Sequence, residues 1–90
     1  MPKFIIEREI PQAGKFDIEH LKSLSKRSNE VLCTLGTGIQ WIHSYVAGDK
    51  IYCIYMAANK EIILEHARIA GFPANTITEV ANIIEPQWGE

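Results

Sequence analysis

The chain has 90 residues, of which 47% are hydrophobic and 22% are charged, and its formal net charge is −2. At this length we expect a single domain, residues 1–90, with a modest core, because such a chain buries only about 60–65% of its unfolded surface. The scattered basic residues argue against nucleic acid as a partner. No apolar run reaches the roughly 18 residues that cross a bilayer, which argues against a membrane span.

Cysteine usage and the N-terminal stretch indicate a compartment. The start, MPKFIIEREI, lacks the long apolar segment and the small-residue cleavage site of a signal peptide. Cys33 and Cys53 form neither a CxxC motif nor a disulfide framework. These features predict a cytoplasmic protein with free thiols.

A strand and a helix are predicted in the first third of the chain. Residues 3–10, KFIIEREI, alternate in part between apolar and polar side chains, as a strand does. Asp17 is placed to cap a helix that runs to about Leu35, with Gly36 as its stop. The apolar stripe of this helix follows a period of 3.6 residues and consists of Ile18, Leu21, Leu24, Val31, Leu32 and Leu35.

A β-hairpin is predicted in the middle of the chain. Residues 39–47 and 50–57 are rich in Ile, Val, Tyr and Trp, which favour strands. Gly48 and Asp49 between them suit a two-residue type II′ turn with glycine first.

A second helix and a last strand complete the predicted elements. Asn59 is placed to cap a helix over residues 60–70, which Gly71 ends. Residues 76–84, TITEVANII, predict a strand. The tail, residues 85–90, is too short to fold alone, and we expect Trp88 to lie against some other surface.

The predicted order β-α-β-β-α-β is typical of the α+β ferredoxin-like fold. In this fold a four-stranded antiparallel sheet carries two helices on one face. The other face needs a cover, and in a small protein a second copy often supplies it. We therefore expect a homodimer joined through the open sheet face, as a barrel-like α/β assembly.

The turn at Gly48 and Asp49 fixes the register of the hairpin and divides its side chains between two faces. The pairs are Ala47 with Lys50, Tyr45 with Tyr52, His43 with Ile54, and Trp41 with Met56. One face is aromatic and amphipathic: Trp41, His43, Tyr45, Tyr52, Ile54 and Met56. The other is mostly aliphatic: Ile42, Ser44, Val46, Ile51, Cys53 and Tyr55. We assign the aromatic face to the side of the sheet without helices.

Glu7 is expected to share the open face with His43. A carboxylate on a central strand is disfavoured beneath helices, and the alternation of residues 3–10 puts Glu7 on the side away from Phe4 and Ile6. Two strand spacings of about 4.8 Å each separate Glu7 from His43 at the backbone. Their side-chain tips are thus within reach of one another or of one bound atom.

Two histidines have a functional and a structural interpretation. His43 is either a metal ligand or general base, or a buried histidine hydrogen-bonded to Glu7 or a tyrosine. His66, on the second predicted helix, is either a metal ligand or a packed or charged group near the helix C-terminus. Our face assignment puts the two histidines on opposite sides of the sheet.

The segments PKFIIEREIPQAGK, GIQWIHSYVAGDKIYCIYMAANKE and EHARIAGFPANTITEV resemble a family of small bacterial proteins of unknown function, described as nickel-binding or nickel-responsive. The resemblance spans residue 2 to about residue 84 and implies a ferredoxin-like subunit and a dimer. Within the shared segments, Glu7, His43 and His66 are candidate metal donors. Imidazole and carboxylate suit Ni(II), and Zn(II) and Cu(II) accept the same donors. No organic cofactor is predicted.

The sequence leaves two specific functions open, besides a structural or regulatory interaction module that takes neither metal nor substrate. The first is a non-catalytic protein that binds nickel or a similar metal, for sequestration or response, through Glu7, His43 or His66. The second is a small-molecule-binding protein or enzyme of the dimeric ferredoxin-like type. There, His43 and Glu7 form an acid–base pair in a cavity lined by the aromatic residues Trp41, Tyr45 and Tyr52. The chain has no HExxH, DxDxG or nucleophile-elbow motif, so motif evidence for catalysis is weak.

Overall fold

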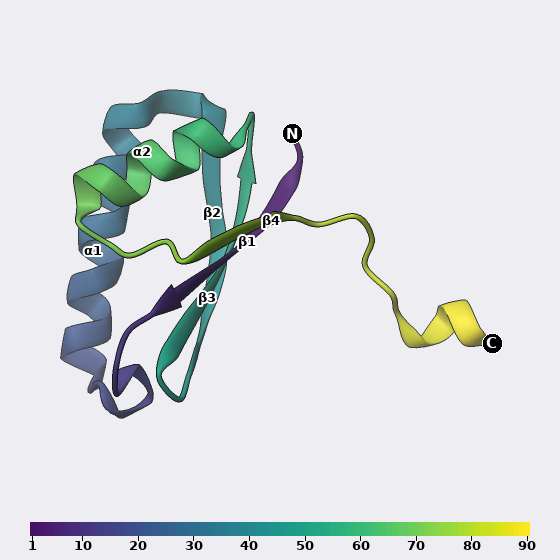
Figure 1. Cartoon of the computed structure of the whole chain (residues 1–90), viewed down its shortest axis with the longest axis horizontal. Helices are drawn as coiled ribbons and strands as arrows, with labels where there is room; N and C mark the ends of the chain where they lie inside the picture. The colour runs from purple at the N-terminus through teal and green to yellow at the C-terminus, as the bar shows by residue number, and fades with distance from the viewer.

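An antiparallel sheet with the strand order β2-β3-β1-β4 forms the frame of the computed structural model, which describes all 90 residues. The elements are β1 (Lys3–Glu9), α1 (Ile18–Leu35), β2 (Ile39–Ala47), β3 (Lys50–Ala57), α2 (Lys60–Ala70) and β4 (Thr76–Glu79). Both helices lie on one face of the sheet, and the opposite face carries none (Figure 1). The predicted α+β, ferredoxin-like architecture is confirmed. Neither helix is both long and apolar enough to cross a membrane.

The helix ends follow the predicted capping residues. The Asp17 side chain accepts a hydrogen bond of 2.8 Å from the backbone N–H of His20, at the start of α1. Asn59 accepts one of 3.0 Å from the N–H of Ile62, at the start of α2. Gly71 ends α2 in the left-handed conformation with φ of 76°, which a residue without Cβ adopts at little cost.

The hairpin turn has the predicted loop and, next to it, the predicted register. Gly48 has φ of 61°, and Asp49 does not have positive φ, which is the pattern of a type II′ turn. The confirmed pairs are Ala47 with Lys50, Tyr45 with Tyr52, and His43 with Ile54.

Beyond His43 the predicted register is wrong. Trp41 pairs with Tyr55 and not with Met56, because an irregularity between Trp41 and His43 inserts Ile42 as an extra residue in β2. The bulge turns Trp41 to the helix-covered face. Ile42, which simple alternation places beneath the helices, is 41% exposed.

The last strand is shorter than the predicted residues 76–84. β4 ends at Glu79, which lies opposite Phe4, and the N–H of Val80 donates the final bond to the carbonyl of Lys3. Since β1 begins at Lys3, its pairing with β4 ends at this point.

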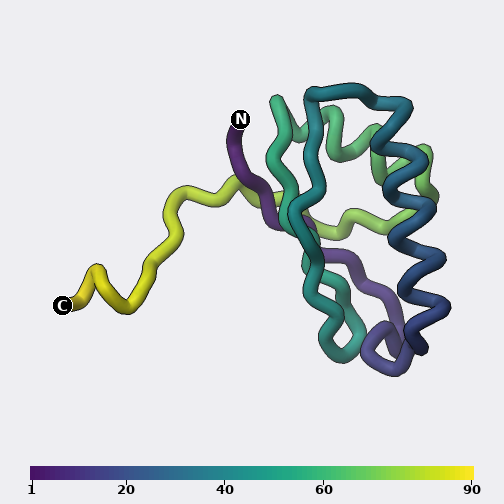
Figure 2. Tube along the Cα trace, turned by 180° about the vertical axis from the view of Figure 1, so that it is seen from behind, coloured from purple at the N-terminus to yellow at the C-terminus, as the bar shows by residue number.

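The C-terminal tail leaves the domain after β4. It extends away from the sheet and the helices and ends in a short 3₁₀ helix, Pro86–Gly89 (Figure 2). Trp88 is 63% exposed, so it does not pack on the domain of its own chain.

The core lies between the sheet and the two helices. Its central buried side chains alternate along the two inner strands and continue into α2: Phe4, Ile6, Cys53, Tyr55 and Ile63. The strict alternation of burial along β3 shows that the sheet packs on one face only.

Candidate functional site

The helix-free face of the sheet is organised in rows of side chains that cross all four strands. One row is Thr76, Glu7, Tyr52 and Tyr45, and the next is Thr78, Ile5, Ile54 and His43. The predicted open-face placement therefore holds for Glu7, His43, Tyr45 and Tyr52, while Trp41 lies on the other side.

His43 is the exposed imidazole of this face. Its Nε2 atom lies 3.1 Å from the hydroxyl oxygen of Tyr45. The two rings meet edge to face, with centroids 5.0 Å apart. Nδ1 makes no hydrogen bond within the chain, so in the tautomer whose Nε2–H donates to Tyr45 the Nδ1 lone pair is free for a metal ion.

Glu7 lies in the neighbouring row and is already engaged. Lys50 Nζ donates to one carboxylate oxygen at 3.3 Å, and Thr76 Oγ1 donates to the other at 3.0 Å. These contacts, the Thr76 bond first, hold the pKa of Glu7 below its ordinary value. Glu7 in β1 pairs with Tyr52 in β3, and β3 separates it from His43 in β2. The acid–base pair expected between Glu7 and His43 does not form within one protomer.

His66 lies on the opposite side of the sheet from His43. Its side chain is fully buried beneath α2, and its Nε2 atom lies 3.2 Å from Ser28 Oγ. Its Nδ1 atom has no partner. Burial, assisted by the nearby positive charge of Arg8, lowers the pKa of His66, so the ring is neutral at pH 7.

The three predicted metal donors thus occupy three separate places. Nowhere in the protomer do three or more His, Cys, Asp or Glu side chains gather in a group able to hold a metal ion.

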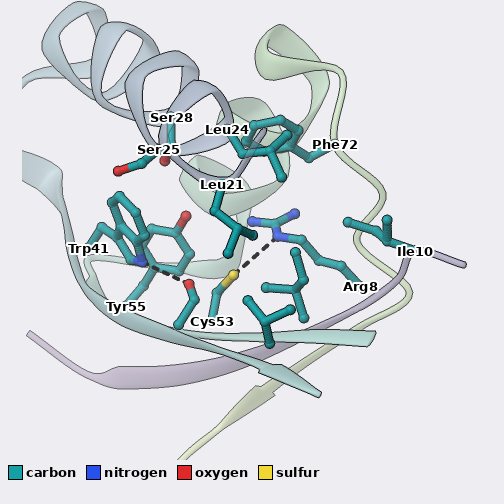
Figure 3. A pocket seen from close by; sticks show the side chains of 13 residues that line it. Arg8, Ile10, Leu21, Leu24, Ser25, Ser28, Trp41, Cys53, Tyr55 and Phe72 are labelled. Carbon is teal, nitrogen blue, oxygen red and sulfur yellow. Dashed lines mark hydrogen bonds between the residues drawn. The ribbon is translucent and has the colours of Figure 1, made fainter. Parts of the chain in front are cut away.

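A pocket that the sequence reasoning missed lies between α1 and the sheet (Figure 3). Its volume is about 190 Å³, and nine of its 13 lining residues are hydrophobic. Trp41 forms part of this wall, and its indole N–H donates to Ser44 Oγ at 2.9 Å. We call this space the Arg8 pocket, after the one charged residue that lines it.

Arg8 extends from β1 into the pocket and is only 2% exposed. Its Nε donates to Cys53 Sγ at 3.3 Å, and its Nη1 donates to the carbonyl of Pro73 at 2.7 Å. Nη2 has no partner. The signal in the sequence was the alternation of β1, which puts Arg8 on the same face as Phe4 and Ile6.

Comparison with known proteins gives a family match and a similar fold. The model of the family described as nickel responsive protein SCO4226-like matches residues 4–80. The crystal structure of SCO4226 from Streptomyces coelicolor A3(2) is similar with a TM-score of 0.74 and 18% identity, over 91% of this chain and 99% of that one. At this identity the structural likeness shows the fold alone. No curated protein matches the chain.

Proposed function

The chain belongs to the family of nickel-responsive SCO4226-like proteins, and from that membership we propose that it binds Ni(II), or a similar divalent transition metal, through His43. The observation that supports this most directly is the geometry of His43. Its ring is exposed on the helix-free face, fixed at Nε2 by Tyr45 and free at Nδ1. A hydrogen bond at one ring nitrogen orients the other toward a metal.

A second protomer is part of the proposal, because one protomer offers too few donors. The helix-free face carries several partly exposed apolar side chains: Ile5, Tyr52, Ile54 and Met56. A two-fold axis through such a face brings the same patch of both copies together. The pair would bury this apolar surface and supply a second copy of His43 to the site.

Removing the His43 ring is expected to weaken Ni(II) binding at least tenfold, about 1.4 kcal/mol. The measurement is isothermal titration of tag-free protein with Ni(II), and with Zn(II) and Cu(II) for selectivity. His20→Ala is the matched control. His20 is also exposed, but it lies on α1, away from the open face, and stacks on Phe16 just before that helix. Equal Ni(II) affinity in His43→Ala and wild type would contradict the proposed site.

Placing a carboxylate at the centre of the open face is expected to separate the dimer. In Ile54→Asp an unpaired charge would be buried between the two sheets, at a cost of several kcal/mol. Light scattering should then report the 10.2 kDa protomer instead of twice that mass. Leu64→Asp, at a position 52% exposed on α2, should leave the mass unchanged. A wild-type monomer at micromolar concentration, or a dimeric Ile54→Asp, would exclude dimerisation through this face.

A further inference from the structure

We propose that the Arg8 pocket binds a small monocarboxylic acid with an apolar body, whose carboxylate pairs with the Arg8 guanidinium. This site lies on the helix-covered side of the sheet and does not depend on the metal proposal.

The first argument is the missing counter-charge. An arginine side chain is always protonated in a protein, and Arg8 is 2% exposed. The three ion pairs of the chain lie elsewhere: Lys22 with Glu19, Lys50 with Glu7, and Arg68 with Glu65. A buried charge without a partner costs several kcal/mol, and a bound anion would remove that cost.

The second argument is the geometry of the donors that remain. Cys53 and Pro73 engage Nε and Nη1, and the ring of Phe72 lies 5.5 Å from the guanidinium carbon. These contacts orient the guanidinium and leave Nη2 buried without a hydrogen-bond partner, on a side chain that lines the pocket. Figure 3 shows the Arg8 side chain extending among the lining residues toward the Cys53 sulfur.

Tyr55 supplies a further donor at the same place. Its phenol lines the pocket, and burial raises its pKa while the neighbouring Arg8 and Ser28 oppose the shift. The phenol therefore keeps its proton at neutral pH, and its O–H can donate a hydrogen bond to a carboxylate oxygen. Charge-assisted bonds of this kind are the strong ones.

The third argument is the size and polarity of the space. A dry cavity of about 150 Å³ accommodates benzene, and this pocket has about 190 Å³. It therefore has room for a ring-sized apolar body with one carboxylate. Arg8 is the single charged residue of the lining, so one negative charge is balanced and a dianion would not be.

The entrance lies between α1 and the edge strand β2. Leu21 and Ser25 on α1, and Trp41 and Ser44 on β2, line the pocket and are partly exposed. Arg8 and Tyr55 are buried behind them. An acid would enter with its carboxylate leading toward the floor of the pocket.

The test is titration of the full chain with benzoate and, separately, with uncharged benzyl alcohol, followed by amide and indole NMR signals. We expect benzoate to shift the signals of Arg8, Cys53 and Trp41 and to bind at least tenfold more tightly than benzyl alcohol. Arg8→Met should lower benzoate affinity at least tenfold. Arg68→Met, an exposed arginine outside the pocket, should not.

A second readout comes from His66, which shares Ser28 with the pocket wall. Bound benzoate should offset the positive charge of Arg8 that helps to lower the pKa of His66, so the pKa of His66 should rise when benzoate is added. Should Arg8→Met fail to fold, the comparison of the two ligands on wild type decides. Equal affinity for benzoate and benzyl alcohol, or shifts outside the pocket, would overturn the proposal. Absence of binding would overturn it as well.

Discussion

Replacing Ile63 with alanine is expected to lower the free energy of unfolding by about 3 kcal/mol, within the usual range of about 2–5 kcal/mol for this change. Ile63 is 0% exposed and belongs to the cluster between α2 and the sheet. The truncation loses apolar burial and leaves a cavity. A domain of this length has a total stability of roughly 5–13 kcal/mol, so the midpoint of thermal unfolding should fall by more than about 10 °C.

The matched control for this substitution is its neighbour in α2. Leu64 is 52% exposed, and Leu64→Ala should cost less than about 1 kcal/mol. Urea unfolding followed by circular dichroism measures the stability of both variants. The free energy of unfolding should fall with urea concentration at the same slope in each. Similar losses at the two positions would mean that α2 presents a different face to the sheet.

Acidification below pH 6.5 is expected to destabilise the fold through His66. The pKa of His66 is lowered from 6.5 by burial and by Arg8, so the unfolded chain takes up the proton first as the pH falls. The stability is complete above the unfolded pKa and is lost between that value and the lower folded one. The loss is at most about 1.4 kcal/mol per pH unit for one group.

The pH dependence is measured by urea unfolding between pH 7 and pH 5. His66→Gln keeps a polar side chain facing Ser28 but cannot titrate, so its stability should vary less over this range. His20→Gln should follow wild type, because His20 is exposed on α1. A wild-type stability that stays level from pH 7 to pH 5 would show that His66 is protonated without cost.

Local chemistry explains the parts of the fold that the sequence predicted correctly. Asp17 and Asn59 cap helices through contacts within three residues along the chain. The positive φ at Gly48 is a requirement of the two-residue turn, and it fixes which hairpin residues face each other. Such signals need no knowledge of distant segments.

The incorrect predictions concern features without a local signal. No glycine or proline marks the bulge at Ile42, so simple alternation placed Trp41 on the wrong face. The length of β4 depends on where β1 begins, at Lys3. The alternation of β1 places Arg8 on the helix-covered side, but its hydrogen bond to the carbonyl of Pro73, 65 residues away, has no local signal. Long-range partners decide each of these features.

The two edge strands of the sheet, β2 and β4, bear on whether the protein can aggregate edge to edge. A long, flat outermost strand offers unpaired backbone groups that recruit foreign strands, and bulges or shortness blunt this tendency. Here β2 carries the irregularity at Ile42, and β4 has four residues. Both edges of the sheet are therefore poor templates for lateral growth into fibrils.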